Sequence, residues 1–565
     1  MAQREANASL LANEDLREEF DDEERELLRK EEFKRTRRER ARMLVCLGLS
    51  IVLTSSAVTI AYYVTKMSLE RSRNVIMMVS DGLGPASQTY GRSFYQFKNK
   101  NKPLEGEITS LDKMLVGALR TQSSDSLISD SASGATAFSC ALRTYNGAIG
   151  VNPEGNPCGT ILEAAKDLGM LTGLVVTSRV THATPAAFSA HVIDRDMEAD
   201  IAAQQIGDNP LMRQIDLMLG GGRCIFLPNT TQGSCRLDGR DLIKEAQEKY
   251  GWKYVMENRS DWEALLVANK KKLPLPAMGL FNLDHMNYEI DKGHQKAEVR
   301  EPSLLEMTKA ALLTLKGQAA TNQGFFLMIV SSQIGMSARN NDPVAHAHEI
   351  LEYHKAVELV QQFVYTHPDT LVISTSDHET GGFTLGYQDD PGTYPGYFWN
   401  PEVIDRANAS TEFLTRQIYA YSTQAERTPN QKEREQFVKT QIFDQGLGIM
   451  DPTLEEIAYL ANKDADYSKI PPFLGHAISR RAKLGWTTLG YTGVDVNLYA
   501  TGDGYSRLLG NHEDIEIGEV MSSYLKVDLT RITRRLQKSA HEWFKPKEGQ
   551  FTTSRRRIRL QKSGN

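Results

Sequence analysis

Residues 325–342 read FFLMIVSSQIGMSARNND. The first six residues form an uninterrupted apolar run, which is typical of a strand buried on both faces of a parallel sheet. Three similar runs occur at 75–80 (VIMMVS), 173–180 (GLVVTSRV) and 370–375 (TLVIST). Because these runs alternate with loops and helical segments, and no Pro/Gly-rich linker divides the chain, we expect one large α/β domain on a mainly parallel sheet. Loop-rich insertions are expected around 225–300 and 385–480.

The ends of these apolar runs differ in chemistry. In parallel α/β sheets, ligands bind at the carboxyl ends of the strands. Asp81 follows the first run, and Asp377 and His378 follow the last. Two carboxylates and an imidazole are a ligand set suited to zinc, although acids at strand ends can also serve only as caps. The run at 325–330 instead leads into residues that neither bind a metal nor move a proton readily: Val330, Ser331, Gly335 and Arg339.

The N-terminal region predicts a membrane anchor. Residues 43–64 (MLVCLGLSIVLTSSAVTIAYYV) are 22 residues without a charge, and as a helix they would span ~33 Å, enough to cross a bilayer core. A secretory signal peptide is shorter and starts nearer the N-terminus. Six basic residues lie just before this segment and three just after it. The positive-inside rule therefore predicts a single-pass type II protein, with residues 1–42 forming a disordered cytosolic tail.

The remaining chain fits the oxidising side of a membrane. Cys46 lies inside the predicted span and four cysteines follow it, which permits two disulfides. The local pairings are Cys140–Cys158 and Cys224–Cys235; four buried thiols are the alternative. Glycosylation acceptor sequons stand at Asn229, Asn258 and Asn408.

A short motif in the cytosolic tail predicts the destination. EERELL (Glu23 to Leu28) matches an acidic dileucine signal that a sorting adaptor would recognise and route to the vacuole or lysosome; a solvated helix surface is the alternative. We therefore expect a vacuolar membrane protein with a lumenal domain at 65–530 and a basic C-terminal tail at 531–565. The net charge of −6 indicates no nucleic-acid partner.

Two further residues carry candidate phosphate chemistry. In DSASGATAF (130–138), Ser131 stands where a loop enters a predicted helix of small residues. Backbone N–H groups and the positive field of a helix N-terminus favour a phosphate on its oxygen, whereas a simple N-cap is the alternative. Arg195, in AHVIDR, could hold a phosphate with two parallel hydrogen bonds, or be an ordinary surface arginine.

Together these motifs resemble the alkaline phosphatase family. The resemblance runs from residue 73 to about 520 through DGLGPAS (81–87), DSASGATAFSCALRTYNGAIGV (130–151), THATPAAFSAHVIDR (181–195) and TSDHETGG (375–382). The type II anchor and dileucine motif are similar to those of fungal vacuolar members. The resemblance implies a three-layer α/β sandwich, usually a homodimer. It also implies that a serine attacks phosphate monoesters with the help of two zinc ions and one magnesium ion.

The resemblance assigns roles by position. Ser131 matches the nucleophile and Arg195 the phosphate-binding arginine. The ligands of the zinc that activates the serine match Asp81, Asp377 and His378. Asp81 also serves magnesium in the family, as does the threonine matching Thr184. His182 is a supporting residue at a position where some members have Asp and others His.

Four metal-ligand positions depart from the family. It reads roughly E-G-S-R-I-D-x-A-G-H-x-N-D-P where this chain reads VSSQIGMSARNNDP, so Val330 replaces the magnesium-binding Glu. Gly335 and Arg339 replace the Asp and His that hold the other zinc. The third ligand of that zinc belongs to a T-T-H-G-H-T motif, which here reads TTLGYT: Tyr491 replaces the ligand and Leu489 the other His.

These replacements predict a damaged enzyme. We expect one zinc site to remain, with the second zinc site and the magnesium site in question. In the family the missing zinc supplies the hydroxide that hydrolyses the phosphoserine, by lowering the pKa of bound water from ~15.7 to ~7. We therefore expect a phosphomonoesterase with severely impaired turnover. The alternative is a pseudophosphatase that binds phosphate or a partner, or regulates an active paralogue. Arg339 either supplies the missing positive charge or arose by drift.

Overall fold

The computed structural model describes residues 73–99, 108–319, 323–423 and 428–544. The predicted span at 43–64 and the predicted sorting motif lie outside these ranges, as do residues 545–565 of the predicted C-terminal tail. Within the described ranges, no helix combines the length and the hydropathy needed to cross a bilayer.

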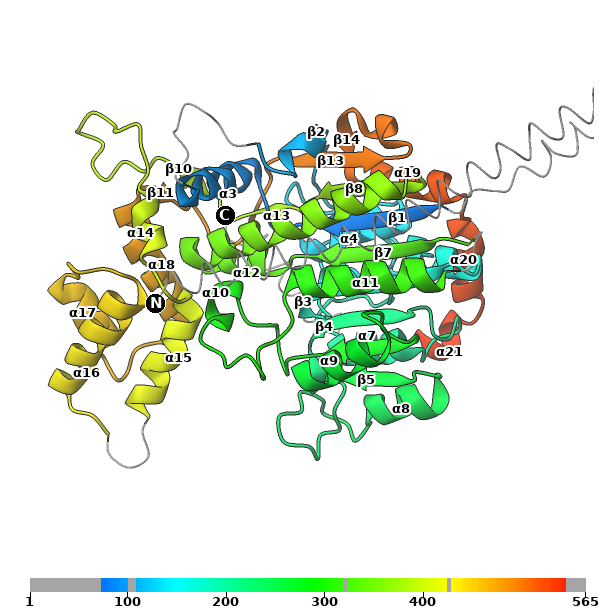
Figure 1. Ribbon diagram of the computed structural model, residues 1–565, viewed down its shortest axis with the longest axis horizontal. Coiled ribbons are helices and arrows are strands. Elements are labelled where there is room, and N and C mark those ends of the chain that lie inside the picture. The colour runs from blue at the N-terminus through cyan, green and yellow to red at the C-terminus, as the bar shows by residue number, and fades with distance from the viewer. Residues whose placement is uncertain (1–72, 100–107, 320–322, 424–427, 545–565) are drawn as a thin grey trace, which may run out of the picture.

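A ten-stranded sheet forms the centre of the domain, in the order β14-β2-β13-β8-β1-β7-β3-β4-β6-β5 (Figure 1). Its strands are β1 (Asn74–Val79), β2 (Leu115–Arg120), β3 (Leu171–Arg179), β4 (Leu217–Gly221), β5 (Tyr254–Met256), β6 (Ala277–Leu280), β7 (Phe325–Val330), β8 (Thr370–Thr375), β13 (Val496–Gly502) and β14 (Gly510–Glu513). Of these, only β13 runs antiparallel to its neighbours. The predicted mainly parallel sheet is therefore confirmed.

The apolar runs divide their side chains between two cores. In β7, Phe325, Leu327 and Ile329 contact one helical layer, while the alternate residues contact the other: Phe326, Met328 and Val330. This alternation is what a strand with period two produces when both faces of the sheet are covered. All six residues are fully buried, and burying one large apolar side chain contributes about 1.5–3 kcal/mol.

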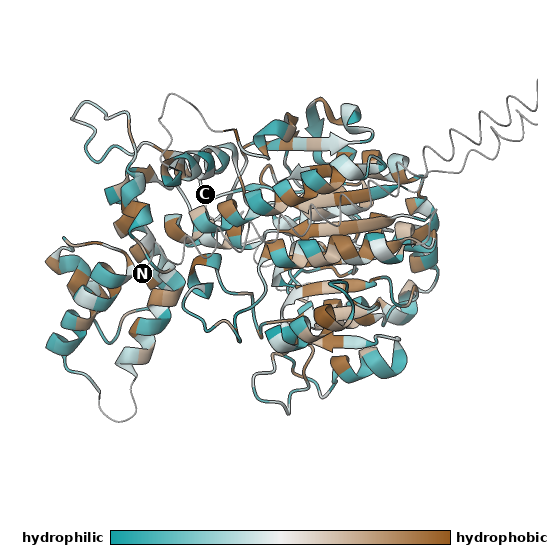
Figure 2. Ribbon diagram, viewed as in Figure 1, coloured by the Kyte–Doolittle hydropathy of each residue, from teal (hydrophilic) through white to brown (hydrophobic). Residues whose placement is uncertain are grey.

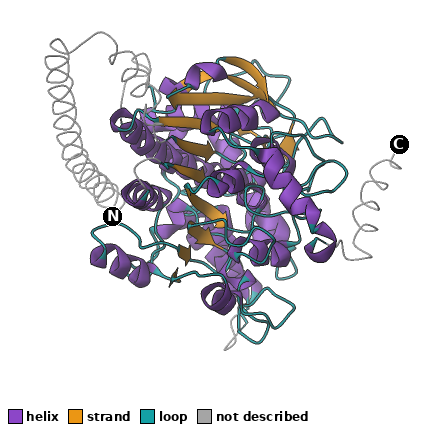
Figure 3. Ribbon diagram, turned by 90° about the vertical axis from the view of Figure 1, so that its right-hand side faces the viewer, coloured by secondary structure: helices purple, strands orange, loops and turns teal. Residues whose placement is uncertain are grey.

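Helices cover both faces of the sheet, as the view in Figure 3 shows. One layer includes α3 (Pro85–Lys98), α11 (Leu304–Gln318) and α13 (Pro343–Thr366). The other includes α4 (Ser131–Cys140), α5 (Ile161–Asp167), α19 (Asp514–Leu525) and α20 (Leu529–Lys538). Hydrophobic residues concentrate in the strands and hydrophilic residues on the outer helical surfaces (Figure 2). The result is a three-layer sandwich.

The two insertions contain more regular structure than the sequence suggested. The first holds α8 (Leu242–Lys249), α9 (Arg259–Ala268) and α10 (Glu289–Lys292), and it adds β5 and β6 to the sheet. The second holds α14 (Pro401–Asp405), α15 (Thr411–Ser422), α16 (Gln431–Phe437), the π-helix η4 (Val438–Gly446), α17 (Leu454–Leu460) and α18 (Ile470–Ala482).

The sequence did not reveal these elements, because they are short and begin with polar capping residues. Their N-cap side chains accept backbone N–H bonds in α8, α9, α15, α16 and α17, and these polar residues look like loop signals in the sequence.

The C-terminal boundary and the disulfides complete the fold. Helix α20 crosses the predicted boundary at residue 530, because its apolar residues Ile532 and Leu536 are buried in the second core. Both predicted local disulfides are present, Cys140–Cys158 and Cys224–Cys235.

Candidate metal and phosphate site

The candidate residues gather where two neighbouring strands end. Strands β1 and β8 pair in parallel, with Val79 opposite Thr375. Asp81 and Asp377 each follow two residues later, so the register places the two carboxylates side by side. Ser131 is the first residue of α4, and the side chain of Asp130 caps this helix by accepting the N–H of Ser133. The predicted helix N-terminus is therefore confirmed, while Asp130 rather than Ser131 serves as the N-cap.

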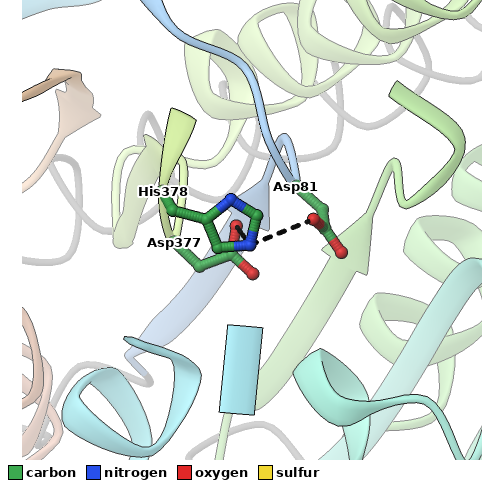
Figure 4. Close-up of side chains that lie close together, drawn as sticks. All are labelled: Asp81, Asp377 and His378. Atoms are coloured by element: carbon green, nitrogen blue, oxygen red, sulfur yellow. Dashed lines mark ion pairs between the residues drawn. The ribbon is translucent and has the colours of Figure 1, made fainter. Parts of the chain in front are cut away.

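Asp81, Asp377 and His378 form a compact group of donors. Their ligand atoms all lie within 4.8 Å of one another. His378 Nε2 is 3.7 Å from Oδ1 of Asp81 and 3.7 Å from Oδ1 of Asp377 (Figure 4). All three residues are buried. Thr184 Oγ1 donates to both carboxylates at 3.3 Å.

The charges and contacts of this group fit one zinc ion. Burial, and then the neighbouring Asp377 carboxylate, raise the pKa of Asp81 well above its usual value, because both disfavour its charged form and outweigh Arg195, Thr184 and Arg339. Thr380 Oγ1 lies 3.1 Å from Nδ1 of His378 and so orients the ring, leaving Nε2 to face the carboxylates. Three protein ligands are typical of a zinc site with an open position. Ser131 Oγ, 2.8 Å from His378 Nε2, lies beside that position.

Arg195 is held next to the nucleophile candidate. Its Nη1 donates to Oδ2 of Asp130 at 2.9 Å, and its Nη2 lies 3.1 Å from Nε2 of His182. Burial opposes the charge of Arg195, but the oxygens of Tyr491 and Asp130 outweigh burial and raise its pKa. Burial, followed by the Arg195 charge, lowers the pKa of His182 well below its usual value. His182 is therefore neutral and accepts from Arg195.

The residues at the predicted magnesium position do not fit magnesium. This ion needs oxygen ligands in near-octahedral geometry. Asp81 and Thr184 offer oxygens, but Val330 presents only methyl groups and is fully buried in the second core.

The residues at the second zinc position do not fit zinc either. Gly335, Arg339 and Tyr491 provide neither carboxylate, imidazole nor thiolate. Instead the Tyr491 ring lies against His378, with 3.9 Å between ring centroids. The Arg339 guanidinium also lies over that ring, 5.2 Å from its centroid, and donates to its hydroxyl at 2.9 Å. Gly335 lies so close to Asp81 that an added Cβ would be 2.8 Å from Oδ1. At the predicted second zinc position, Arg339 and Tyr491 thus form a packed arginine–aromatic pair.

Comparison with known proteins identifies this arrangement. Residues 72–527 match the family model described as alkaline phosphatase. The chain belongs to the alkaline phosphatase family. It is 44% identical to an alkaline phosphatase of Schizosaccharomyces pombe over 496 residues, which cover 87% of this chain and 89% of the relative. It is 41% identical to the repressible alkaline phosphatase of Saccharomyces cerevisiae over 515 residues, with 88% and 89% covered.

Solved structures agree on the fold. The alkaline phosphatase of Thermus thermophilus superposes with a TM-score of 0.66 at 26% identity, covering 82% of this chain and 93% of that one. A cold-active alkaline phosphatase from Shewanella sp. gives a TM-score of 0.64 at 29% identity, covering 80% and 99%. The alkaline phosphatase fold is therefore shown. Enzymes of this family use zinc and magnesium. Whether the residues present can bind each of these metals therefore matters for the function of this chain.

Sequence reasoning missed several polar residues of this alkaline phosphatase site. Asp130 is the ion-pair partner of Arg195. The sequence could have pointed to Asp130 because it stands at the start of a predicted helix, where Asp is a favoured N-cap. Behind His182, Arg179 binds Glu198 through two nitrogens and also contacts His285. His182 and His285 meet edge to face. No spacing pattern in the sequence signals that cluster.

Proposed function

We propose that this chain is a phosphomonoesterase of the alkaline phosphatase family that accepts a phosphoryl group on Ser131 and releases it very slowly. One observation carries the proposal. Ser131 Oγ lies 2.8 Å from His378 Nε2 beside an intact Asp–Asp–His group, while the second zinc position holds Arg339 and Tyr491. The parts needed for the first chemical step are present, and those needed for the second are replaced.

The first step uses residues that remain. Ser131 Oγ forms a bond to phosphorus while the bond from phosphorus to the ester oxygen breaks. The proton of the serine hydroxyl passes by way of water to the ester oxygen, which departs as the alcohol. Arg195, held by Asp130, orients the phosphate oxygens and balances their charge. The N-terminus of α4 adds backbone N–H donors and a favourable field. A zinc ion on Asp81, Asp377 and His378 would act as a Lewis acid beside the serine oxygen.

The second step needs an activated water. Water has a pKa of ~15.7 unless a metal lowers it to ~7. Arg339 cannot take over this role, because a guanidinium stays protonated and binds no water as a ligand. Losing several kcal/mol of metal assistance costs several orders of magnitude, since each ~1.4 kcal/mol is tenfold in rate. Phosphoserine hydrolysis therefore limits turnover.

A second candidate function is a pseudophosphatase that binds phosphate or a partner protein, or pairs with an active paralogue. This second function is favoured by the burial of Ser131 and His378. Ser131 is 1% exposed and His378 is fully buried beneath the Tyr491 ring. If this closed arrangement persists, phosphate monoesters do not reach the serine.

A burst experiment separates the two functions. The full chain, purified in detergent and supplied with zinc and magnesium, is mixed with an aryl phosphate. We expect one alcohol released per chain, a phosphoryl adduct on Ser131 by mass spectrometry, and steady-state turnover near background. Ser131→Ala should abolish both burst and adduct. Absence of a burst in the unchanged protein would support the pseudophosphatase, and ordinary sustained turnover would refute both.

We also propose that the chain is a type II protein of the vacuolar membrane and, on the family resemblance alone, a homodimer. The membrane topology is supported by the uncharged segment at 43–64, the basic residues before it and the dileucine motif at Glu23 to Leu28. Two disulfides and the exposed side chains of Asn229, Asn258 and Asn408 fit an oxidising lumen. Protease added to sealed vesicles should remove only residues before Met43, and glycosidase should shift the lumenal part. Protection of the N-terminus would contradict this topology.

A further inference from the structure

Two arginines from distant parts of the chain converge on one oxygen. Arg195 Nη1 lies 3.5 Å from the Tyr491 hydroxyl, and Arg339 Nη1 lies 2.9 Å from it. Arg339 is the last residue of α12 (Gln333–Arg339), and Tyr491 begins the short strand β12 (Tyr491–Thr492). The Nη1 atoms of the two arginines are therefore no further apart than the sum of these two distances.

The position of Tyr491 is fixed by the strand that follows His378. Strand β12 pairs antiparallel with β9 (Glu379–Thr380), with Tyr491 opposite Thr380. The pairing brings the Tyr491 ring over His378, and hence over the hydrogen bond between His378 and Ser131. The oxygen shared by the arginines therefore belongs to a side chain that packs directly on the hydrogen-bond partner of Ser131.

A single phenol oxygen is a weaker partner for two cations than a phosphate dianion with several oxygens. Hydrogen bonds between ionised partners are roughly twice as strong as neutral ones, and the planar guanidinium fork matches phosphate oxygens. Arg195 already has the Asp130 carboxylate. Among the described residues, the hydrogen bond and the ring contact of Arg339 are both with Tyr491, while its charge acts on the buried Asp81 carboxylate without an ion pair between the two. A dianionic phosphate would give Arg339 an ionic partner that the tyrosine does not supply.

We propose that Arg339 and Arg195 form a phosphate-binding pair in which Arg339 supplies the positive charge of the absent zinc, and that the Tyr491 hydroxyl occupies the phosphate oxygen's place until phosphate displaces it. The inference deepens the proposed function, on which it rests for the location of the phosphate beside Ser131. It accounts for binding without turnover, because a guanidinium holds an anion but generates no hydroxide. The ligand class is a phosphate monoester or inorganic phosphate.

Calorimetric titration of the full chain, in detergent with one equivalent of zinc, tests the pair. The probes are inorganic phosphate and phenylphosphonate, which imitates a monoester but cannot be hydrolysed. Arg339→Gln should weaken binding of both probes about tenfold or more, as loss of a hydrogen bond to a charged group does. Arg339→Lys should weaken binding less, because it keeps the charge. Tyr491→Phe should strengthen binding, because it removes the competing oxygen.

The matched control is Arg416→Gln. Arg416 is also an exposed arginine over an aromatic ring, 6.0 Å from the Phe413 centroid, but it lies in α15 and pairs with Glu412. Its replacement should leave phosphate binding unchanged. Equal affinities in the Arg339→Gln and Arg416→Gln proteins, or weaker binding in Tyr491→Phe, would overturn the inference. If Arg339→Gln weakens the binding of only one probe, the natural ligand of the pair is the one which that probe represents, inorganic phosphate or a phosphate monoester. The phosphoryl adduct on Ser131 is measured in a separate experiment. Its absence would refute the proposed function but would not change the measured phosphate affinities.

Discussion

Replacing Gly335 with alanine should disturb both the stability of the domain and the zinc site. Gly335 lies in α12 against the turn that follows β1. A Cβ at this position would be 2.8 Å from Oδ1 and 3.0 Å from the backbone oxygen of Asp81. From the other side, a Cβ on Gly82 would be 2.7 Å from the Cα of Gly335. The helix and the turn therefore touch through glycines, and neither side has room for a methyl group.

The size of the effect comes from two opposing contributions. Overpacking a closely packed site costs about 1–3 kcal/mol. Alanine in place of glycine inside a helix returns roughly 0.5–1 kcal/mol. We therefore expect Gly335→Ala to lower the free energy of unfolding by about 1–2 kcal/mol. Because Asp81 must move by a few tenths of an ångström, zinc affinity should fall by about tenfold or more, as it does when a ligand loses its supporting contacts.

Urea unfolding and competition for zinc with a chelator measure the two effects. The control is Gly317→Ala in α11, where the new Cβ would meet only the flexible end of the Lys272 side chain, at 3.0 Å. That variant should be as stable as the unchanged protein or slightly more stable, with unchanged zinc affinity. If Gly335→Ala behaves like the control in both assays, the contact between α12 and Asp81 is not close and the reasoning fails. The same contact predicts that Gly335→Asp alone destabilises the protein instead of restoring a ligand.

Three further outcomes are expected. Elemental analysis should find about one tightly bound zinc per chain and little magnesium, and Asp377→Ala should remove that zinc. A content of two zinc ions and one magnesium ion per chain would show that the ligands are misassigned. Sustained phosphatase turnover should return only when four replacements are combined, whereas each one alone should leave it near background: Val330→Glu, Gly335→Asp, Arg339→His and Tyr491→His. Burial raises the pKa of Glu349 to about 8, so its ionisation disfavours the folded state, and the stability it contributes falls as pH rises from about 4.5 to about 8. Glu349→Gln should therefore gain stability relative to the unchanged protein between pH 5 and pH 8.5 in urea unfolding, and a relative loss would contradict the sign.

The central strands could be predicted from sequence because they are buried on both faces. Each reads as a continuous apolar run, and the four predicted runs correspond to β1, β3, β7 and β8. The strands near the two edges of the sheet have no such apolar run. In β2, one residue of six is fully buried, so its sequence lacks the expected pattern. Strands β5 and β6 have three and four residues, too short for a periodicity.

The site could be predicted in its residues but not in its contacts. The motifs singled out Ser131, Asp81, Asp377 and His378, which the structure brings together, because each lies at the start of a helix or just after a strand. The stacking of Tyr491 on His378 depends on pairing between two strands of two residues each, which lie far apart in the chain. The close approach of Gly335 to Asp81 depends on where α12 lies relative to the turn after β1. Both are properties of packing, which a single sequence does not display.

The pairing of β1 has a mechanical consequence. The strand starts at Asn74, so residues 1–72 connect to the domain through it, and the preceding Arg73 lies over the Tyr524 ring of α19 at 5.5 Å. Strand β1 is flanked in parallel by β7 and β8 along its length. A pull on the N-terminal segment therefore loads two hydrogen-bonded ladders in shear, so many bonds resist together. If the chain is tethered through that segment, drag on the domain first loads a strand that is hydrogen-bonded on both sides, rather than α12 and β12, which carry Arg339 and Tyr491.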